Sequence, residues 1–131
     1  MARMKNDFLP MNSAEMKARG WAELDVLLIS GDAYVDHPSF AAAVIGRVLE
    51  AEGLRVGIIA QPDWNDPESL LPMGAPRLFC GVTAGNLDSM LAAYTAARRK
   101  RKEDSFSEGG AVGKRPNMAT VVYSQLARRA F

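Results

Sequence analysis

The 131-residue chain is poor in the residues that build metal centres, since it has one cysteine, Cys80, and one histidine, His37. A single cysteine cannot form an internal disulfide or supply several thiolate ligands by itself. A single histidine likewise excludes a metal site built on several imidazoles. The sequence therefore predicts no metal site and no cofactor held by this chain alone.

Long apolar runs are also missing. No segment approaches the about 18 consecutive apolar residues that a membrane span requires, and no apolar segment of a secretory signal follows the charged N-terminus. Apolar residues make up 48% and charged residues 24% of the chain, which are ordinary values for a folded domain. We therefore expect one globular domain without a membrane partner.

The net charge of +1 hides an asymmetry along the chain. Residues 1–97 carry 7 basic and 12 acidic side chains, whereas residues 98–131 carry 9 basic and 3 acidic ones. Such a bias favours either a polyanionic partner such as nucleic acid or the solvated end of a helix. The polyanion candidates are five consecutive cations, Arg98, Arg99, Lys100, Arg101 and Lys102.

Polar, mixed residues open the chain, so we expect a flexible N-terminal arm over 1–11 and a single domain over 12–131. A short helix is predicted at the start of the domain. Asn12 and Glu15 have the spacing of a capping box, and Gly20 is placed to end the helix.

The next segment has the pattern of a βαβ unit. Strands are predicted over 25–30 and 54–60, separated by a helix that has Pro38 at its first position. Apolar residues at helical spacing continue this helix to Leu49, and Gly53 ends it. The apolar run in the first strand is continuous rather than alternating, which indicates a strand covered on both faces, as in a parallel sheet.

The pattern then repeats, which predicts an α/β fold with a mainly parallel sheet and flanking helices. A doubly wound domain rarely ends on its fourth strand, so we expect the domain to be truncated there. The later elements are a short helix over 67–71, a third strand over 77–82, a helix from Gly85, a loop over 103–117, a fourth strand over 118–123 and the start of a helix over 124–131.

Ligands of open parallel sheets bind outside the carboxyl ends of the strands. This rule selects the loops over 31–37, 61–65, 83–88 and 124–125 as the rim of a ligand site. The candidate rim residues are Asp32, Tyr34, Asp36, His37, Gln61, Asp63, Trp64, Thr83, Asn86, Asp88 and Gln125.

The first loop leaves two interpretations open. Asp32, Asp36 and His37 could form an acid–base pair or part of a metal site. Alternatively, Asp36 or His37 caps the following helix while Asp32 stabilises the turn. Tyr34 and Trp64 likewise either stack on a planar ligand or pack within the fold.

The third loop and its strand are also open to two interpretations. The segment Thr83–Asn86 precedes a predicted helix, so its N–H groups either hold an anion or form a plain turn. Neither glycine-rich phosphate-binding fingerprint is present. Cys80 lies in mid-strand without a basic neighbour, so we expect a structural thiol rather than a nucleophile.

Three strings of the sequence resemble the N-terminal region of YgiQ-type radical SAM proteins. They are Gly-Asp-Ala-Tyr-Val-Asp-His-Pro-Ser-Phe at 31–40, Val-Gly-Ile-Ile-Ala-Gln-Pro-Asp-Trp at 56–64 and Gly-Val-Thr-Ala-Gly-Asn at 81–86. The likeness runs from about Phe8 to Phe131. The sequence departs from the family pattern at Ala97, over 105–108 and at Leu126.

The resemblance implies a cytoplasmic bacterial protein several times longer than this chain. In it, a Rossmann-like domain similar to cobalamin-binding domains precedes a radical SAM barrel. The barrel binds S-adenosylmethionine and holds a [4Fe–4S] cluster through a Cys-x-x-x-Cys-x-x-Cys motif, which is absent here. The Asp-x-His-x-x-Gly motif of cobalamin ligation is absent as well.

Three hypotheses follow. In the first, the chain is a non-catalytic N-terminal domain that covers or shapes the active site of the absent barrel. In the second, the rim binds a cobalamin or a nucleotide. In the third, residues 98–102 bind RNA.

Overall fold

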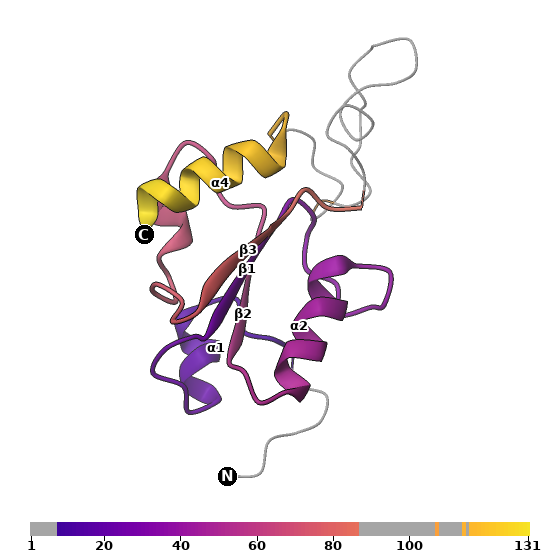
Figure 1. The fold of residues 1–131 in the computed structure, drawn as a ribbon, viewed down its shortest axis with the longest axis vertical. Helices are drawn as coiled ribbons and strands as arrows, with labels where there is room; N and C mark the ends of the chain where they lie inside the picture. The colour runs from indigo at the N-terminus through magenta and orange to yellow at the C-terminus, as the bar shows by residue number, and fades with distance from the viewer. Residues whose placement is uncertain (1–7, 87–106, 108–113, 115) are drawn as a thin grey trace.

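The computed structural model describes residues 8–86, 107, 114 and 116–131 (Figure 1). Within these residues, three strands form one sheet and four helical segments pack around it. In chain order they are α1 (Ser13–Ala18), β1 (Val26–Ser30), α2 (Ala41–Ala51), β2 (Val56–Ala60), the 3₁₀ helix η1 (Pro67–Leu70), β3 (Phe79–Thr83) and α4 (Ala119–Ala130). The helix expected after Gly85 and most of the loop expected over 103–117 lie outside the described residues.

The sheet is parallel and has the order β2-β1-β3. Val26 at the start of β1 is aligned with Val56 of β2 and with Phe79 of β3. Every residue of the central strand β1 is buried. The parallel α/β architecture predicted from the continuous apolar run of β1 is therefore confirmed.

Each face of the sheet has its own core. On the α2 face, Val26 and Leu28 of β1 pack with Ala42 and with Leu9 from the segment before α1. On the opposite face, which we call the α4 face, the core draws on β1, η1 and α4. Its fully buried members include Leu27, Ile29, Leu70, Tyr123 and Leu126. Figure 1 shows α2 and α4 on opposite sides of the sheet.

The prediction of a fourth strand over 118–123 is wrong. These residues begin α4, and no fourth strand occurs in the described part of the chain. Ala119, Tyr123 and Leu126 are buried whereas Val121 is exposed, which is the spacing of a helix that packs through one face. A short run containing two valines is ambiguous between strand and buried helix, and packing against η1 and β3 decided it.

The start of α2 also differs from the prediction. Pro38 is not the first helical residue, because the helix begins at Ala41 with Phe40 at the N-cap position and no side-chain cap. The helix packs on the sheet through Ala42, Ala43 and Gly46. A Cβ atom at Gly46 would lie 2.5 Å from Leu9 Cδ1, so small residues permit the close approach. The larger apolar residues of α2, Val44, Ile45 and Val48, are exposed.

The last residues of the expected N-terminal arm are packed. Leu9 and Pro10 are fully buried, and the N–H of Ile58 in β2 donates to the Pro10 carbonyl over 2.9 Å. This contact covers the outer edge of β2 with the segment that precedes α1. None of the helices in the described parts is long and apolar enough to cross a membrane.

Candidate functional site

The loops after β1, β2 and β3 meet at the carboxyl edge of the sheet. The N–H of Gly31, after β1, donates to the Thr83 carbonyl at the end of β3 over 3.0 Å. The N–H of Gln61, after β2, donates to the Ser30 carbonyl over 2.7 Å. Parallel strands bring these loops together because their carboxyl ends share one edge. We call the resulting surface the rim.

Asp32 joins the first and third loops of the rim. Its side chain is nearly inaccessible, with 3% of the residue exposed. Its Oδ2 accepts the Asn86 N–H over 2.7 Å, while its own N–H donates to the Ser30 hydroxyl over 3.0 Å. A buried carboxylate must be hydrogen-bonded, and here the bond fixes one loop against another.

Gln61 joins the second loop to residue 107. Its backbone is left-handed, with a φ of 49°, and its Nε2 donates to the Gly31 carbonyl and to the Ser107 hydroxyl at 3.1 and 2.6 Å. Left-handed backbone is uncommon for residues other than glycine and is retained where surrounding contacts hold it. The Gln61 side chain therefore connects the second loop of the rim to the first loop and to Ser107.

A cavity of about 290 Å³ lies beside Gln61. Asp63, Trp64 and Lys114 line it together with Ala60 and Pro62. An indole, an ammonium and a carboxylate around one space can bind a small planar or charged group. The volume is near the lower limit for small-molecule sites.

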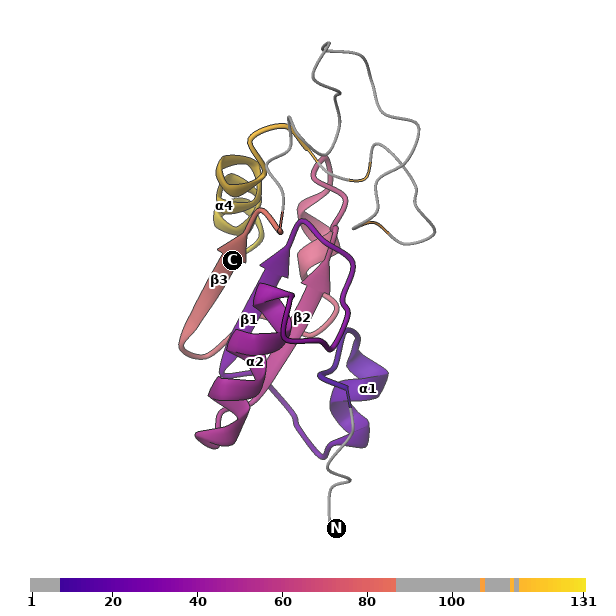
Figure 2. The same cartoon turned by 90° about the vertical axis from the view of Figure 1, so that its right-hand side faces the viewer.

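Tyr34 and Asp36, which the sequence placed on the rim, belong to a different cluster. The loop after β1 turns back along the α2 face before α2 begins (Figure 2). The Tyr34 hydroxyl donates to Asp36 Oδ1 over 3.0 Å and accepts the Leu9 N–H over 3.1 Å. Its ring stacks edge-to-face on Phe8 with centroids 6.3 Å apart. Tyr34 therefore packs against Phe8 and holds the backbone of Leu9.

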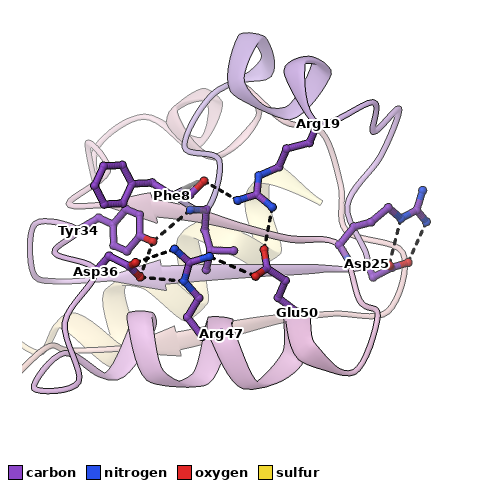
Figure 3. A network of polar contacts seen from close by, with 9 residues as sticks. Phe8, Arg19, Asp25, Tyr34, Asp36, Arg47 and Glu50 are labelled. Atoms are coloured by element: carbon purple, nitrogen blue, oxygen red, sulfur yellow. Dashed lines mark hydrogen bonds and ion pairs between the residues drawn. The ribbon is translucent and has the colours of Figure 1, made fainter. Parts of the chain in front are cut away.

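Arginines complete this cluster, which we call the Arg47 network (Figure 3). Arg47 donates to both carboxylate oxygens of Asp36 at 3.0 and 2.6 Å, and its other amino group pairs with Glu50 at 3.2 Å. Arg19 pairs with the same Glu50 at 2.7 Å. The network fastens the loop after β1 and the end of α1 to α2.

The Arg47 network also determines the protonation of its members. Hydrogen bonds from Arg47 lower the pKa of Asp36 below its ordinary value. Burial raises the pKa of Tyr34 to about 12, and the Asp36 carboxylate contributes to the rise. Asp36 therefore stays ionised and paired at neutral pH and does not cap α2. The capping interpretation of Asp36 is wrong because a bidentate guanidinium satisfies the carboxylate instead.

His37 does not cap α2 either, because its Nδ1 accepts the Ser39 N–H at 3.1 Å. It lines a groove of about 360 Å³ with Pro38, Val44 and Val48. Within the described ranges, no group of three or more histidine, cysteine, aspartate or glutamate side chains is arranged to hold a metal ion.

The remaining candidates are distributed as follows. Gln125 is exposed on α4, so the fourth loop of the expected rim does not exist. Asp88 and the basic run Arg98–Lys102 lie outside the described residues. Sequence reasoning missed Ser30 and Ser107, since no local motif marks a hydroxyl whose partners are distant in the chain.

Cys80 is a partly buried residue of β3 that packs against the core of the α4 face. Burial raises the pKa of its thiol to about 11. We expect Cys80 to react with Ellman's reagent at pH 8 about 100-fold more slowly in the folded chain than in urea, because the thiolate is the reactive form. Equal rates in both states would contradict a structural thiol.

The family model for the radical SAM N-terminal domain matches residues 8–131. This chain belongs to the radical SAM N-terminal family. The resemblance found in the sequence is therefore confirmed.

The relatives that the chain matches are UPF0313 proteins, which form the YgiQ-type family. A relative from Bradyrhizobium diazoefficiens is 59% identical over 124 residues, which are 95% of this chain and 18% of the relative. A relative from Thermotoga petrophila is 58% identical and one from Shewanella oneidensis 56%, with 95% of this chain matched to 22% and 16% of their lengths. The chain thus spans about a fifth of these relatives. No solved structure matches this chain. The expected likeness to cobalamin-binding domains is therefore not supported by a structural match.

The chain's own residues do not fit an iron–sulfur cluster. The cluster motif of radical SAM proteins needs three thiolates, and this sequence contains only Cys80. That thiol is partly buried, and its raised pKa disfavours the thiolate that a metal requires. No step of cluster chemistry can therefore be assigned to this chain.

Proposed function

We propose that this chain is the non-catalytic N-terminal part of a radical SAM enzyme, whose full-length form uses a [4Fe–4S] cluster and S-adenosylmethionine in a separate barrel. In this proposal the rim lies toward the barrel and shapes access to its active site. Family membership supports the assignment to an N-terminal part, and so does the fact that the chain matches only about a fifth of the length of its relatives. The absence of three thiolates supports the non-catalytic role.

The observation that supports the proposal is the set of hydrogen bonds that join the loops of the rim. The Asp32–Asn86 bond joins the first loop to the third, and the Gln61–Gly31 bond joins the second loop to the first, at the edge where parallel sheets bind their ligands. A surface that positions another component must be rigid before contact. The Arg47 network lies apart from the rim and has a structural explanation.

The test uses a chimera in which residues 8–131 replace the matched segment of the Bradyrhizobium diazoefficiens relative. We expect Asp32→Ala to lower the rate of reductive S-adenosylmethionine cleavage about tenfold, which corresponds to a loss of about 1.4 kcal/mol of transition-state stabilisation. The cluster absorbance should stay unchanged, because Asp32 is not a ligand of the cluster.

Asp36→Ala is the matched control, because it removes a carboxylate from the same loop but outside the rim. It should lower the melting temperature without changing the cleavage rate of the folded enzyme. Equal cleavage rates in the parent chimera and a folded Asp32→Ala chimera would contradict a rim that serves the active site.

A second candidate function is binding of a nucleotide or cobalamin at the rim. The cavity lined by Trp64 and Lys114 favours it, since an indole can stack on a planar ring and an ammonium can pair with a phosphate. RNA binding through residues 98–102 stays a prediction, because these residues lie outside the described parts.

A further inference from the structure

The two outer edges of the sheet differ. The edge of β2 is covered, since the Ile58 N–H donates to the Pro10 carbonyl over 2.9 Å. β3 pairs with β1 alone among the described strands. The outer edge of β3 therefore presents backbone groups without a strand partner in the described part of the chain.

The sequence of β3 does not protect this edge. Exposed edge strands usually carry charged residues, prolines or bulges that prevent further pairing. β3 reads Phe-Cys-Gly-Val-Thr over 79–83 and has none of these, and Leu78 and Phe79 are 50% and 49% exposed. The other edge strand, β2, is equally unprotected in sequence and is covered. Because β3 also lacks charged residues and prolines, we infer that its outer edge is covered in the full-length protein.

The backbone register identifies which groups are available. The Phe79 N–H and the Thr83 carbonyl point toward β1, since they bond to the Asp25 carbonyl at 3.4 Å and the Gly31 N–H at 3.0 Å. Successive residues of a strand point their backbone groups to opposite sides. The N–H and carbonyl groups of Cys80 and Val82 therefore face outward.

Helix α4 leads back along this edge. It packs on β3, and Figure 1 shows it running beside β3 in the opposite direction. It lies on the face opposite α2, the helix that connects β1 to β2. Crossovers between parallel strands are right-handed in nearly all cases. With α4 on this face, a right-handed crossover from β3 places the next parallel strand beyond β3 and away from β1.

We propose that the outer edge of β3 accepts a parallel strand from the chain that follows α4 in the full-length family proteins, extending the sheet to β2-β1-β3-new strand. The relatives supply that chain, because the matched segment is only 16–22% of their length and corresponds to their N-terminal region. The proposal rests on family membership and not on the role of the rim.

Hydrogen exchange, measured residue by residue, tests the proposal on the 131-residue chain and on the chimera described above. We expect the amides of Cys80 and Val82 to exchange at least about 100-fold more slowly in the chimera, because pairing protects them from solvent. The Gly81 amide is the internal control, because it faces β1 and should be protected in both proteins. Hydrogen exchange does not depend on cleavage activity. The strand proposal can therefore be wrong while the rim proposal is right, and the rim proposal can be wrong while the strand proposal is right.

Two outcomes would overturn the proposal. Unchanged exchange of Cys80 and Val82 relative to Gly81 would mean that no strand is added. Protection that is already present in the 131-residue chain and rises with its concentration would mean that a second copy occupies the edge.

A pair of variants provides an independent measurement. Val82→Pro replaces the valine side chain and also removes the outward N–H, a loss that an edge strand tolerates. Val82→Ala likewise replaces the side chain but keeps that N–H. The difference in melting temperature between the two variants should be larger in the chimera than in the 131-residue chain. An equal difference in both proteins would count against strand addition.

Discussion

Replacing Asp25 by asparagine is expected to lower the free energy of unfolding by about 2 kcal/mol, within the range for hydrogen bonds to a charged group. Asp25 is 4% exposed and lies just before β1. Its carboxylate accepts bonds from the Arg55 N–H at 2.8 Å, from the Arg55 guanidinium at 3.1 and 2.9 Å, and from Arg77 at 2.9 Å. Asparagine has a similar size but no charge, so Arg55 and Arg77 both lose their ion pair with residue 25.

The large effect follows from the position of this carboxylate. Arg55 directly precedes β2 and Arg77 lies two residues before β3, so one side chain ties together the amino ends of all three strands. Glu23→Gln is the control, because Glu23 is exposed and makes one 3.4 Å contact with Arg55. We expect its effect on the free energy of unfolding to stay within about 0.5 kcal/mol. Urea denaturation at pH 7 measures both variants.

The contribution of Asp25 should depend on pH. Hydrogen bonds from Arg55 and then Arg77 hold the pKa of Asp25 well below its usual range. The unfolded chain takes up this proton near pH 4 while the folded chain stays ionised, so the stabilisation is present above about pH 4 and is lost as the pH falls further. The difference between the parent chain and Asp25→Asn should therefore shrink from pH 7 to pH 3. A constant difference would contradict the lowered pKa.

Tyr123→Ala is expected to cost about 3–5 kcal/mol, as for other large aromatic side chains removed from a core. Tyr123 is fully buried in the core of the α4 face, together with Leu27, Ile29 and Leu70. Truncation leaves a cavity between α4 and the sheet, which the backbone cannot fill without moving the helix. Thermal or urea unfolding of the 131-residue chain measures the loss.

Two control variants on α4 test the helical register. Gln125 is exposed, and Val121 is 47% exposed, so Gln125→Ala and Val121→Ala should each change the free energy of unfolding by much less than Tyr123→Ala. In a strand, Val121 and Tyr123 would share one face and be buried together. Similar losses for Val121→Ala and Tyr123→Ala would therefore support the strand and contradict the helix.

Much of the fold was predictable because some patterns have one structural solution. The apolar run of Val26–Ile29 has no polar alternation, so it does not fit a strand with one solvent-exposed face. The strand–helix–strand spacing predicts two parallel strands joined by a helical crossover. Parallel strands then place their following loops on one edge whatever the side chains are. The meeting of Asp32, Gln61 and Asn86 at the rim follows from this topology.

Other predictions failed where a pattern had two solutions. The valines near Tyr123 fit a strand locally, but packing against η1 and β3 stabilises a helix. Pro38 was predicted to open α2, but the helix begins at Ala41 and contacts the sheet through small residues such as Ala42 and Gly46. In each case the neighbouring element decided which face of the segment became buried.

The sequence by itself determined the parallel α/β sheet, the edge on which its loops gather, the family and the lack of ligands for a cluster. Only the tertiary structure decided which polar residues stay on that edge. Arg47 draws Asp36 away from the rim, Asn86 engages Asp32, and Asp25 joins arginines 30 and 52 residues away. A buried charge takes the partner that the fold brings within hydrogen-bond distance, and separation along the chain does not reveal that partner.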